Sequence, residues 1–394
     1  MKKWILMSMT VMLIADASMA QSPFDSILDS IKYNNKTIRL KAKELEERRL
    51  NLKSEMNLSN PKVDYDYLKG SPSTAGNQTD LTINQPFDFP TAYIKRKQLL
   101  EEQNTEAELA LLLVKQEVLL DAKMLLLELI FRNKIQDILL ARMKNAQNYL
   151  SAYELKFTSG DANILDLNKA KLEMIDVNTK VELNSSEILQ LKQKLIELNG
   201  GENLNFQLFT YPERVDVPEV EALELEIESQ DPIRKLLEQQ RVISSKNIEF
   251  SKSMALPKIE TGYHYQAILG QTFQGVHVGF TIPLWENRNK IKSMQAHLIA
   301  TESKLDEHKI EHSAEIKQLH EKQRSLKSIL AQYEQLLEPE EYSRLLNQAF
   351  EFGEISSINY YMEIAYNYTT VYNYLLTEME YHQAIARLYR FQLN

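Results

Sequence analysis

His308 and His312 form the residue pair in this sequence whose spacing best suits chemistry. Four residues apart in a helical pattern, two imidazoles reach the same side of a helix, where they could bind a metal ion. Glu307, Lys309 and Glu311 flank them, however, and mixed charges of this kind are typical of a solvated helix face. We therefore expect the pair to lie in solvent and predict no resident metal there.

A second histidine pair, His264 and His277, falls on the polar sides of two predicted strands. The two would stand opposite each other if the hairpin joining the strands is centred between Gly270 and Gln271. We interpret them as polar residues that line a wet surface rather than as metal ligands.

Motifs for catalysis do not occur in the sequence. It contains no Gly-rich phosphate loop, no Gly-x-Ser-x-Gly and no His-Glu-x-x-His. Paired carboxylates are frequent, but with 55 acidic residues they arise by chance. The absence of cysteine excludes disulfides, thiolate metal sites and a lipid-modified N-terminal cysteine. We expect neither an enzyme nor a cofactor.

The first twenty residues have the pattern of a secretory signal peptide. Lys2 and Lys3 precede an apolar run from Trp4 to Ala15, and Ser18-Met19-Ala20 is a small-x-small cleavage pattern before Gln21. The alternative, an uncleaved anchor, would need a longer apolar run. An exported chain without cysteine suggests a bacterial envelope protein. Its formal charge of −9 disfavours nucleic acid as a partner.

Landmarks repeat along the chain at one nearly constant interval, which indicates an internal duplication. Phe157-x-x-Gly160 returns as Phe350-x-x-Gly353, Pro61 returns as Pro257, and Pro86 returns as Pro283. We predict a first repeat over 21–199, a linker with short strand-like pieces over 200–230, and a second repeat over 231–394.

Each repeat is predicted to run helix, strand, strand, very long helix, tight turn, helix. The expected fold is mainly α with a small β part, because only 10 glycines and 11 prolines interrupt 394 residues. The predicted elements are helices at about 26–58, 93–156 and 163–199, a helix that begins at Asp231-Pro232, and strands at about 62–68, 79–87, 258–266 and 275–284. Pro339 should kink or interrupt the second long helix.

The first long helix would reach about 96 Å, more than a compact domain needs. Its segment from Leu109 to Phe131 is apolar around much of its circumference, so neighbouring helices must cover it on more than one side.

The strands alternate between an apolar, aromatic face and a polar face with charges such as Asp64 and Asp66. The apolar face includes Val63, Tyr65, Tyr67, Ile83, Tyr263, Val278 and Phe280. Two interpretations stay open: a half-buried soluble sheet, or the wall of a transmembrane β-barrel whose apolar face meets lipid. Four strands cannot close a barrel, so the second interpretation needs several chains that pool their strands.

The repeated turns read as tight helical hairpins. Gly160 and Gly353 suit the left-handed end of a helix, and Asn163 and Ser356 are good caps for the helix that follows. Asp166 and Asn359 fall at the third helical position, where an acid also favours the helix dipole.

Together these residues resemble the TolC-like family of outer-membrane efflux proteins. The duplication, the paired strands with their prolines and the two Phe-x-x-Gly turns carry the resemblance over essentially the whole mature chain. The stretch LLEPEEYSRLLNQAFEFGEIS further resembles members that serve heavy-metal-resistance pumps.

The resemblance implies a homotrimer whose twelve strands form one barrel in outer-membrane lipid and whose helices form a periplasmic tunnel. Such a protein is a passive exit duct. Its helix tips dock a periplasmic adaptor (membrane fusion) protein that works with an inner-membrane transporter. The alternative function is a periplasmic adaptor or coiled-coil scaffold without a pore. The cargo, whether drug, metal ion or polypeptide, is not indicated.

The resemblance also implies roles for the turn residues. The expected docking residues are Phe157, Gly160, Asn163, Phe350, Gly353 and Ser356. Asp166 matches an acid that helps to close the mouth in the family, although it could serve as a cap alone. Asn359 and Met362 stand where the second repeat would carry acids, so an acidic ring would rely on Asp161, Glu354 or Glu363.

Overall fold

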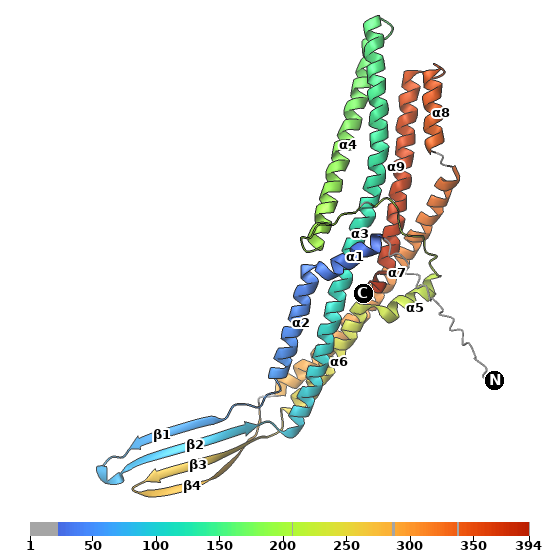
Figure 1. Cartoon of the computed structure of the whole chain (residues 1–394). Coiled ribbons are helices and arrows are strands. Elements are labelled where there is room, and N and C mark those ends of the chain that lie inside the picture. The colour runs from blue at the N-terminus through green and yellow to red at the C-terminus, as the bar shows by residue number, and fades with distance from the viewer. Residues whose placement is uncertain (1–22, 207, 286–287, 337–338, 394) are drawn as a thin grey trace, which may run out of the picture.

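The computed structural model describes residues 23–206, 208–285, 288–336 and 339–393, so the predicted signal peptide at 1–20 lies outside the described residues. The chain is elongated, with a small sheet at one end and two helical hairpins pointing to the other (Figure 1). The helices are α1 (Pro23–Asn34), α2 (Lys36–Ser54), α3 (Pro90–Ser159), α4 (Ile164–Leu198), α5 (Val220–Gln230), α6 (Pro232–Ser253), α7 (Arg288–Leu336), α8 (Pro339–Glu351) and α9 (Ser357–Leu388), with the short 3-10 turns η1 (Ser73–Ala75) and η2 (Arg390–Gln392). The strands are β1 (Lys62–Lys69), β2 (Asn77–Phe87), β3 (Lys258–Ile268) and β4 (Gln271–Thr281).

Helix α3 runs the length of the molecule from the sheet to the far tip (Figure 1). Its 70 residues correspond to about 105 Å at 1.5 Å per residue. It begins with Pro90, where the missing N–H costs nothing, and ends at Gly160, whose φ of 85° no other residue type adopts as readily. Helices α2 and α6 pack along its sheet-proximal half and α4 along its distal half.

The apolar middle of α3 is covered from several sides, as the sequence predicts. Leu126, Leu127, Leu129 and Ile130 are buried completely or almost so. Their partners come from α1, α4 and α9: Phe24, Ile27, Ile31, Leu191, Leu195 and Ala386. Different helices therefore cover the different apolar sides of this segment of α3.

The predicted helix over 26–58 is wrong in one respect, because it is two helices. Asn35 breaks it and caps α2, its side chain accepting from the Ile38 N–H at 3.0 Å. The same side chain donates to the Leu198 carbonyl at the end of α4, at 2.8 Å. A contact with a residue so distant in sequence therefore decides where the first helix ends.

The prediction of strand-like pieces in the 200–230 linker is also wrong. Apart from residue 207, which is not described, this segment is irregular up to α5 and contains no strand. Leu223 and Ile227 of α5 are buried against Ile316 of α7 and Leu388 of α9. The α5 sequence, VEALELEIESQ, is rich in the helix formers Ala, Leu and Glu, and burial of these two side chains fixes the helix against α7 and α9.

The four strands form one antiparallel sheet in the order β1-β2-β3-β4, so each repeat supplies a hairpin and β2 joins β3. The predicted hairpin centre in the second repeat is one residue too late. Leu269 and Gly270 both have positive φ, as a two-residue hairpin turn requires, so the centre lies between them. His264 therefore faces Gly275 and His277 faces Gly262, and the two histidines are not opposite each other.

Helix α7 ends at Leu336 and α8 begins at Pro339, as expected for a proline that cannot continue a helix. The first repeat has no such break, and α3 is continuous over the corresponding stretch. Among the described residues, no helix is both long enough and apolar enough to span a membrane.

Candidate functional site

One face of the sheet is apolar across all four strands. The pairing aligns Val63 with Ile83, Ile83 with Tyr263, and Tyr263 with Val276, so one row crosses the whole sheet. Paired residues point to the same side, and every second residue along each strand joins them. All seven residues expected to face lipid lie on this side of the sheet.

No described element covers this apolar face. Its exposed members are Val63, Tyr65, Tyr67, Ile83, Tyr263, Val276, Val278 and Phe280. Val276 is 83% and Phe280 is 67% exposed. Burying one such side chain is worth about 1.5–3 kcal/mol, so a patch of eight is a strong drive toward an apolar partner.

The opposite face of the sheet is polar. It presents Asp64, Asp66, Asp80 and His264, and His264 Nδ1 lies 2.9 Å from the Thr82 hydroxyl. The outer edges of β1 and β4 have no strand partner among the described residues. A sheet with one apolar face, one polar face and two unpaired edge strands is incomplete as a single chain.

The two hairpin turns lie at the end of the molecule away from the sheet (Figure 1). They share one hydrogen-bond pattern. The Asp161 N–H donates to the Lys156 carbonyl at 2.8 Å, and the Glu354 N–H donates to the Ala349 carbonyl at 2.8 Å. Gly160 and Gly353 hold the left-handed position, with φ of 85° and 73°. Both turns are therefore Schellman-type helix ends, as the sequence predicts.

The caps of the outgoing helices also form as predicted. The Asn163 side chain accepts from the Asp166 N–H at 3.0 Å, and the Ser356 hydroxyl oxygen accepts from the Asn359 N–H at 3.3 Å. Asp166 in turn accepts from the Asn163 amide at 2.7 Å. Asp166 is therefore a hydrogen-bond partner of Asn163 within its own turn. This structural role would explain the residue even if it had no part in a gate.

The remaining gate candidates are solvent-exposed in the single chain. Asp161 accepts from the Ser159 hydroxyl at 2.8 Å, and Glu363 accepts from the Tyr342 hydroxyl. The Glu363 hydrogen bond raises the pKa of Tyr342 to about 12. Met362 is 66% exposed. A ring of acids would depend on how several chains assemble.

The two expected docking phenylalanines are not equivalent. Phe157 is partly exposed, whereas Phe350 packs against the Tyr149 ring at 5.3 Å and the Tyr360 ring at 4.4 Å. Tyr149 belongs to α3, so this aromatic cluster joins the two hairpins near their tips. The repeats thus present different surfaces despite matching turns.

Further from the tips, charged pairs tie the helices together. Arg142 of α3 donates to Glu173 of α4 at 2.6 Å, and Lys134 of α3 donates to Glu378 of α9 at 2.7 Å. A cleft of about 900 Å³ lies between the hairpins, lined by Arg142, Glu173 and several tyrosines.

The expectation that His308 and His312 lie in solvent is wrong. His312 is buried, and both rings approach Asp231, whose carboxylate is 1% exposed. The sequence identified Asp231 only as the start of a helix. Because 77 residues separate Asp231 from His308, no local pattern links them.

Neither a family model nor a curated protein sequence matches this chain. Solved structures do match its fold. CusC, whose structures concern transmembrane channel formation, superposes with a TM-score of 0.79 at 14% identity over 94% of this chain and 92% of CusC. A membrane protein from Pseudomonas aeruginosa gives 0.78 at 12% identity over 94% and 90%. The outer membrane channel CmeC from Campylobacter jejuni gives 0.74 at 14% identity over 94% and 85%.

The chain has the fold of the TolC-like outer-membrane channels. The TolC-like fold confirms the mainly helical architecture with one four-stranded antiparallel sheet that the sequence predicts. Sequence identities of 12–14% show the fold alone. The function of the sheet and of the helix tips therefore rests on the residues of this chain.

Proposed function

We propose that this protein is an outer-membrane channel, a passive exit duct in which three chains pool their strands into one barrel. The observation that carries this is the uncovered apolar face on a sheet with two open edges. Lipid would cover the face, and β1 of one chain would pair with β4 of the next. The polar face, with its aspartates and histidines, would then line a wet lumen.

The helical part of the proposed channel lies in the periplasm and forms a tunnel. Helix α3, at about 105 Å, would carry the tips far from the membrane. The matching turns at Gly160 and Gly353 would give three chains six tips of two alternating kinds. We propose that these tips dock a periplasmic adaptor protein, which connects the channel to an inner-membrane transporter that supplies the energy.

The similarity to outer-membrane channels supports this proposal, and it also argues against an enzyme. The expected signal peptide at 1–20 would direct export, with a mature chain that begins at Gln21. The predicted link to heavy-metal-resistance pumps stays a prediction.

The experiment is membrane extraction followed by reconstitution. The protein should resist carbonate, dissolve in detergent as a trimer, and produce conductance steps in a planar bilayer. A protein that carbonate releases and that gives no conductance would instead be a periplasmic scaffold without a pore.

A further inference from the structure

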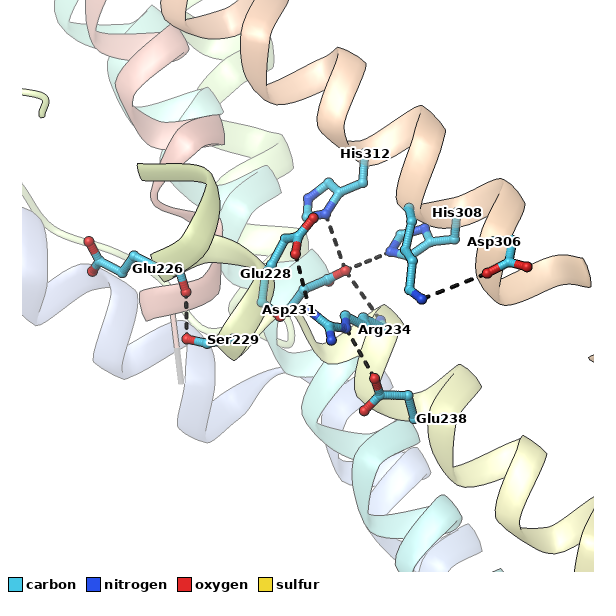
Figure 2. A network of polar contacts seen from close by, with 10 residues as sticks. Glu226, Glu228, Ser229, Asp231, Arg234, Glu238, Asp306, His308 and His312 are labelled. Atoms are coloured by element: carbon cyan, nitrogen blue, oxygen red, sulfur yellow. Dashed lines mark hydrogen bonds and ion pairs between the residues drawn. The ribbon is translucent and has the colours of Figure 1, made fainter. Parts of the chain in front are cut away.

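Asp231, His308 and His312 come together where α5 meets α6 and both pack near α7 (Figure 2). His308 Nε2 lies 2.6 Å and His312 Nδ1 lies 3.4 Å from the same Asp231 oxygen, Oδ2. The two imidazole rings stack at 5.2 Å. Two nitrogens and one oxygen, all within 4.8 Å of one another, thus converge on one point.

The carboxylate is held in place independently of the histidines. Asp231 caps α6, where its Oδ1 accepts from the Ile233 N–H at 3.0 Å and its Oδ2 from the Arg234 N–H at 3.2 Å. A ligand oriented by backbone hydrogen bonds needs little rearrangement to bind a metal ion.

We propose that Asp231, His308 and His312 bind one borderline divalent cation of the Zn²⁺ class. Zn²⁺ binds nitrogen and oxygen ligands at about 2.0–2.1 Å in tetrahedral geometry, which places two ligands roughly 3.3–3.4 Å apart. The His312–Asp231 separation of 3.4 Å already fits this value. The His308–Asp231 separation of 2.6 Å must open by less than an ångström.

His308 has the freedom to make that movement. Its side chain is 16% exposed, whereas those of His312 and Asp231 are 7% and 1% exposed. The exposed side of His308 also gives an ion a route from solvent. Coordination through His308 Nε2 would break its hydrogen bond to Asp231 and leave the ring proton on Nδ1, since an imidazole binds a metal ion through an unprotonated nitrogen.

The neighbouring cations do not compete for this carboxylate. The Arg234 side chain donates to Glu238 at 3.1 Å and to Glu228 at 3.3 Å (Figure 2). Arg390 stands 3.8 Å from Glu315.

The ligand set selects the class of ion. Two imidazoles and a carboxylate suit Zn²⁺, Ni²⁺ or Cu²⁺, while Ca²⁺ and Mg²⁺ prefer oxygen alone and Cu⁺ prefers sulfur. A bound ion would connect the start of the second repeat to α7. The ion would act as a structural cross-link between the junction of α5 with α6 and the long helix α7. This role does not depend on the proposed channel function.

The test uses the full chain without a histidine tag, stripped of metal and titrated with Zn²⁺ by calorimetry. We expect one Zn²⁺ per chain and a Tm that rises with Zn²⁺ concentration, since an ion that binds only the folded state stabilises it. His308→Gln and Asp231→Asn should each weaken binding roughly 100-fold or more, because even outer-shell changes cost about 10–100-fold. Asparagine keeps the helix cap, so Asp231→Asn should still fold.

The matched controls are His264→Gln on the sheet and His297→Gln on an exposed part of α7, which should bind Zn²⁺ as the wild type does. Co²⁺ should give visible absorption bands in the wild type that His308→Gln lacks. Absence of saturable Zn²⁺ binding in the wild type, or unchanged affinity in both site variants, would overturn the proposal and leave a hydrogen-bonded triad only.

Discussion

At the residue scale, a histidine placed in the interior behaves differently from one at the surface. The His382 ring is buried and stacks on Tyr211 at 4.5 Å and 9°. Burial, with further contributions from Arg214, Lys134 and Lys123, lowers its pKa from 6.5 to about 4. Tyr211 belongs to the linker and His382 to α9, so this contact fastens the linker to the helices.

The depressed pKa predicts acid sensitivity. Between pH 6.5 and about 4 the unfolded chain binds a proton at His382 and the folded chain does not, so stability falls as the pH is lowered through this window. The loss should approach about 3 kcal/mol. The Tm of His382→Phe, which keeps a ring on Tyr211, should fall less than the wild-type Tm between about pH 7 and pH 4.5.

Exposed His297 is the control for this comparison, and His297→Gln should keep the wild-type pH dependence. If His382→Phe loses as much stability on acidification as the wild type does, another group is responsible and the prediction is wrong.

At the element scale, residues of the apolar face and of the polar face alternate along each strand. Neighbouring positions can therefore be substituted as matched pairs. Tyr65 and Asp66 are adjacent in the middle of β1, and Gly275 and Val276 are adjacent in the middle of β4. In each pair one residue belongs to the apolar face and the other to the polar face. A Cβ added at Gly275 meets no atom within 4 Å, so that position tolerates a side chain.

Tyr65→Arg and Val276→Arg should block membrane assembly, because an arginine facing lipid near the midplane costs about 2–4 kcal/mol. Asp66→Arg and Gly275→Arg should assemble, since they face water. Phe280→Arg should have a smaller effect because Phe280 is near the end of β4. Heat-modifiable bands from purified membranes provide the measurement, and equal tolerance at all positions would favour a soluble sheet.

The hairpin turns are elements whose conformation depends on single glycines. A Cβ at Gly160 or Gly353 meets nothing within 4 Å, so a substitution there acts through backbone strain alone. Left-handed backbone costs a residue with a Cβ about 1–2 kcal/mol, more if it is β-branched, and asparagine tolerates it best.

Gly160→Val and Gly353→Val should therefore distort the tips and weaken cross-linking to the adaptor, while trimers still form at the distant sheet. Gly160→Asn and Gly353→Asn should retain adaptor binding. Valine variants that still capture the adaptor and export would reduce the turns to simple connectors. Loss of the trimers would show that the turns act through folding instead.

At the scale of the whole molecule, the open edges of β1 and β4 predict closed assembly by strand pairing. Within one chain these edges are three strand spacings apart, about 14 Å, too far for a disulfide. The natural sequence has no cysteine, so introduced thiols have no competitors.

A chain carrying Asp66→Cys and Gly275→Cys should therefore cross-link only between chains, because both positions lie on the polar face of the sheet. Variants with the β1 cysteine at Asp64 or Leu68 in place of Asp66 test the neighbouring registers in which β1 and β4 of two chains could pair. Oxidation should give a ladder that ends at three chains on denaturing gels, and single-cysteine variants should give none. A ladder that continues beyond three, or its absence from every pair, would contradict the closed trimer.

The sequence alone predicted the features that depend on neighbouring residues. The two-residue alternation assigns Tyr65 and Asp66 to opposite faces, and Gly160 with Asn163 encodes a helix end and a cap within four positions. The duplication is likewise visible in sequence, since both copies keep their landmarks in order. The docking and gating roles of the turn residues stay predictions.

Tertiary structure decided what depends on contacts between distant residues. Asn35 breaks the first helix where its side chain reaches the Leu198 carbonyl. The burial of His312 beside Asp231 follows from the packing of α5 and α6 against α7. A helix pattern specifies which residues share a face, but it cannot specify which partner will cover that face, because the partner's position is set by the chain folding back on itself.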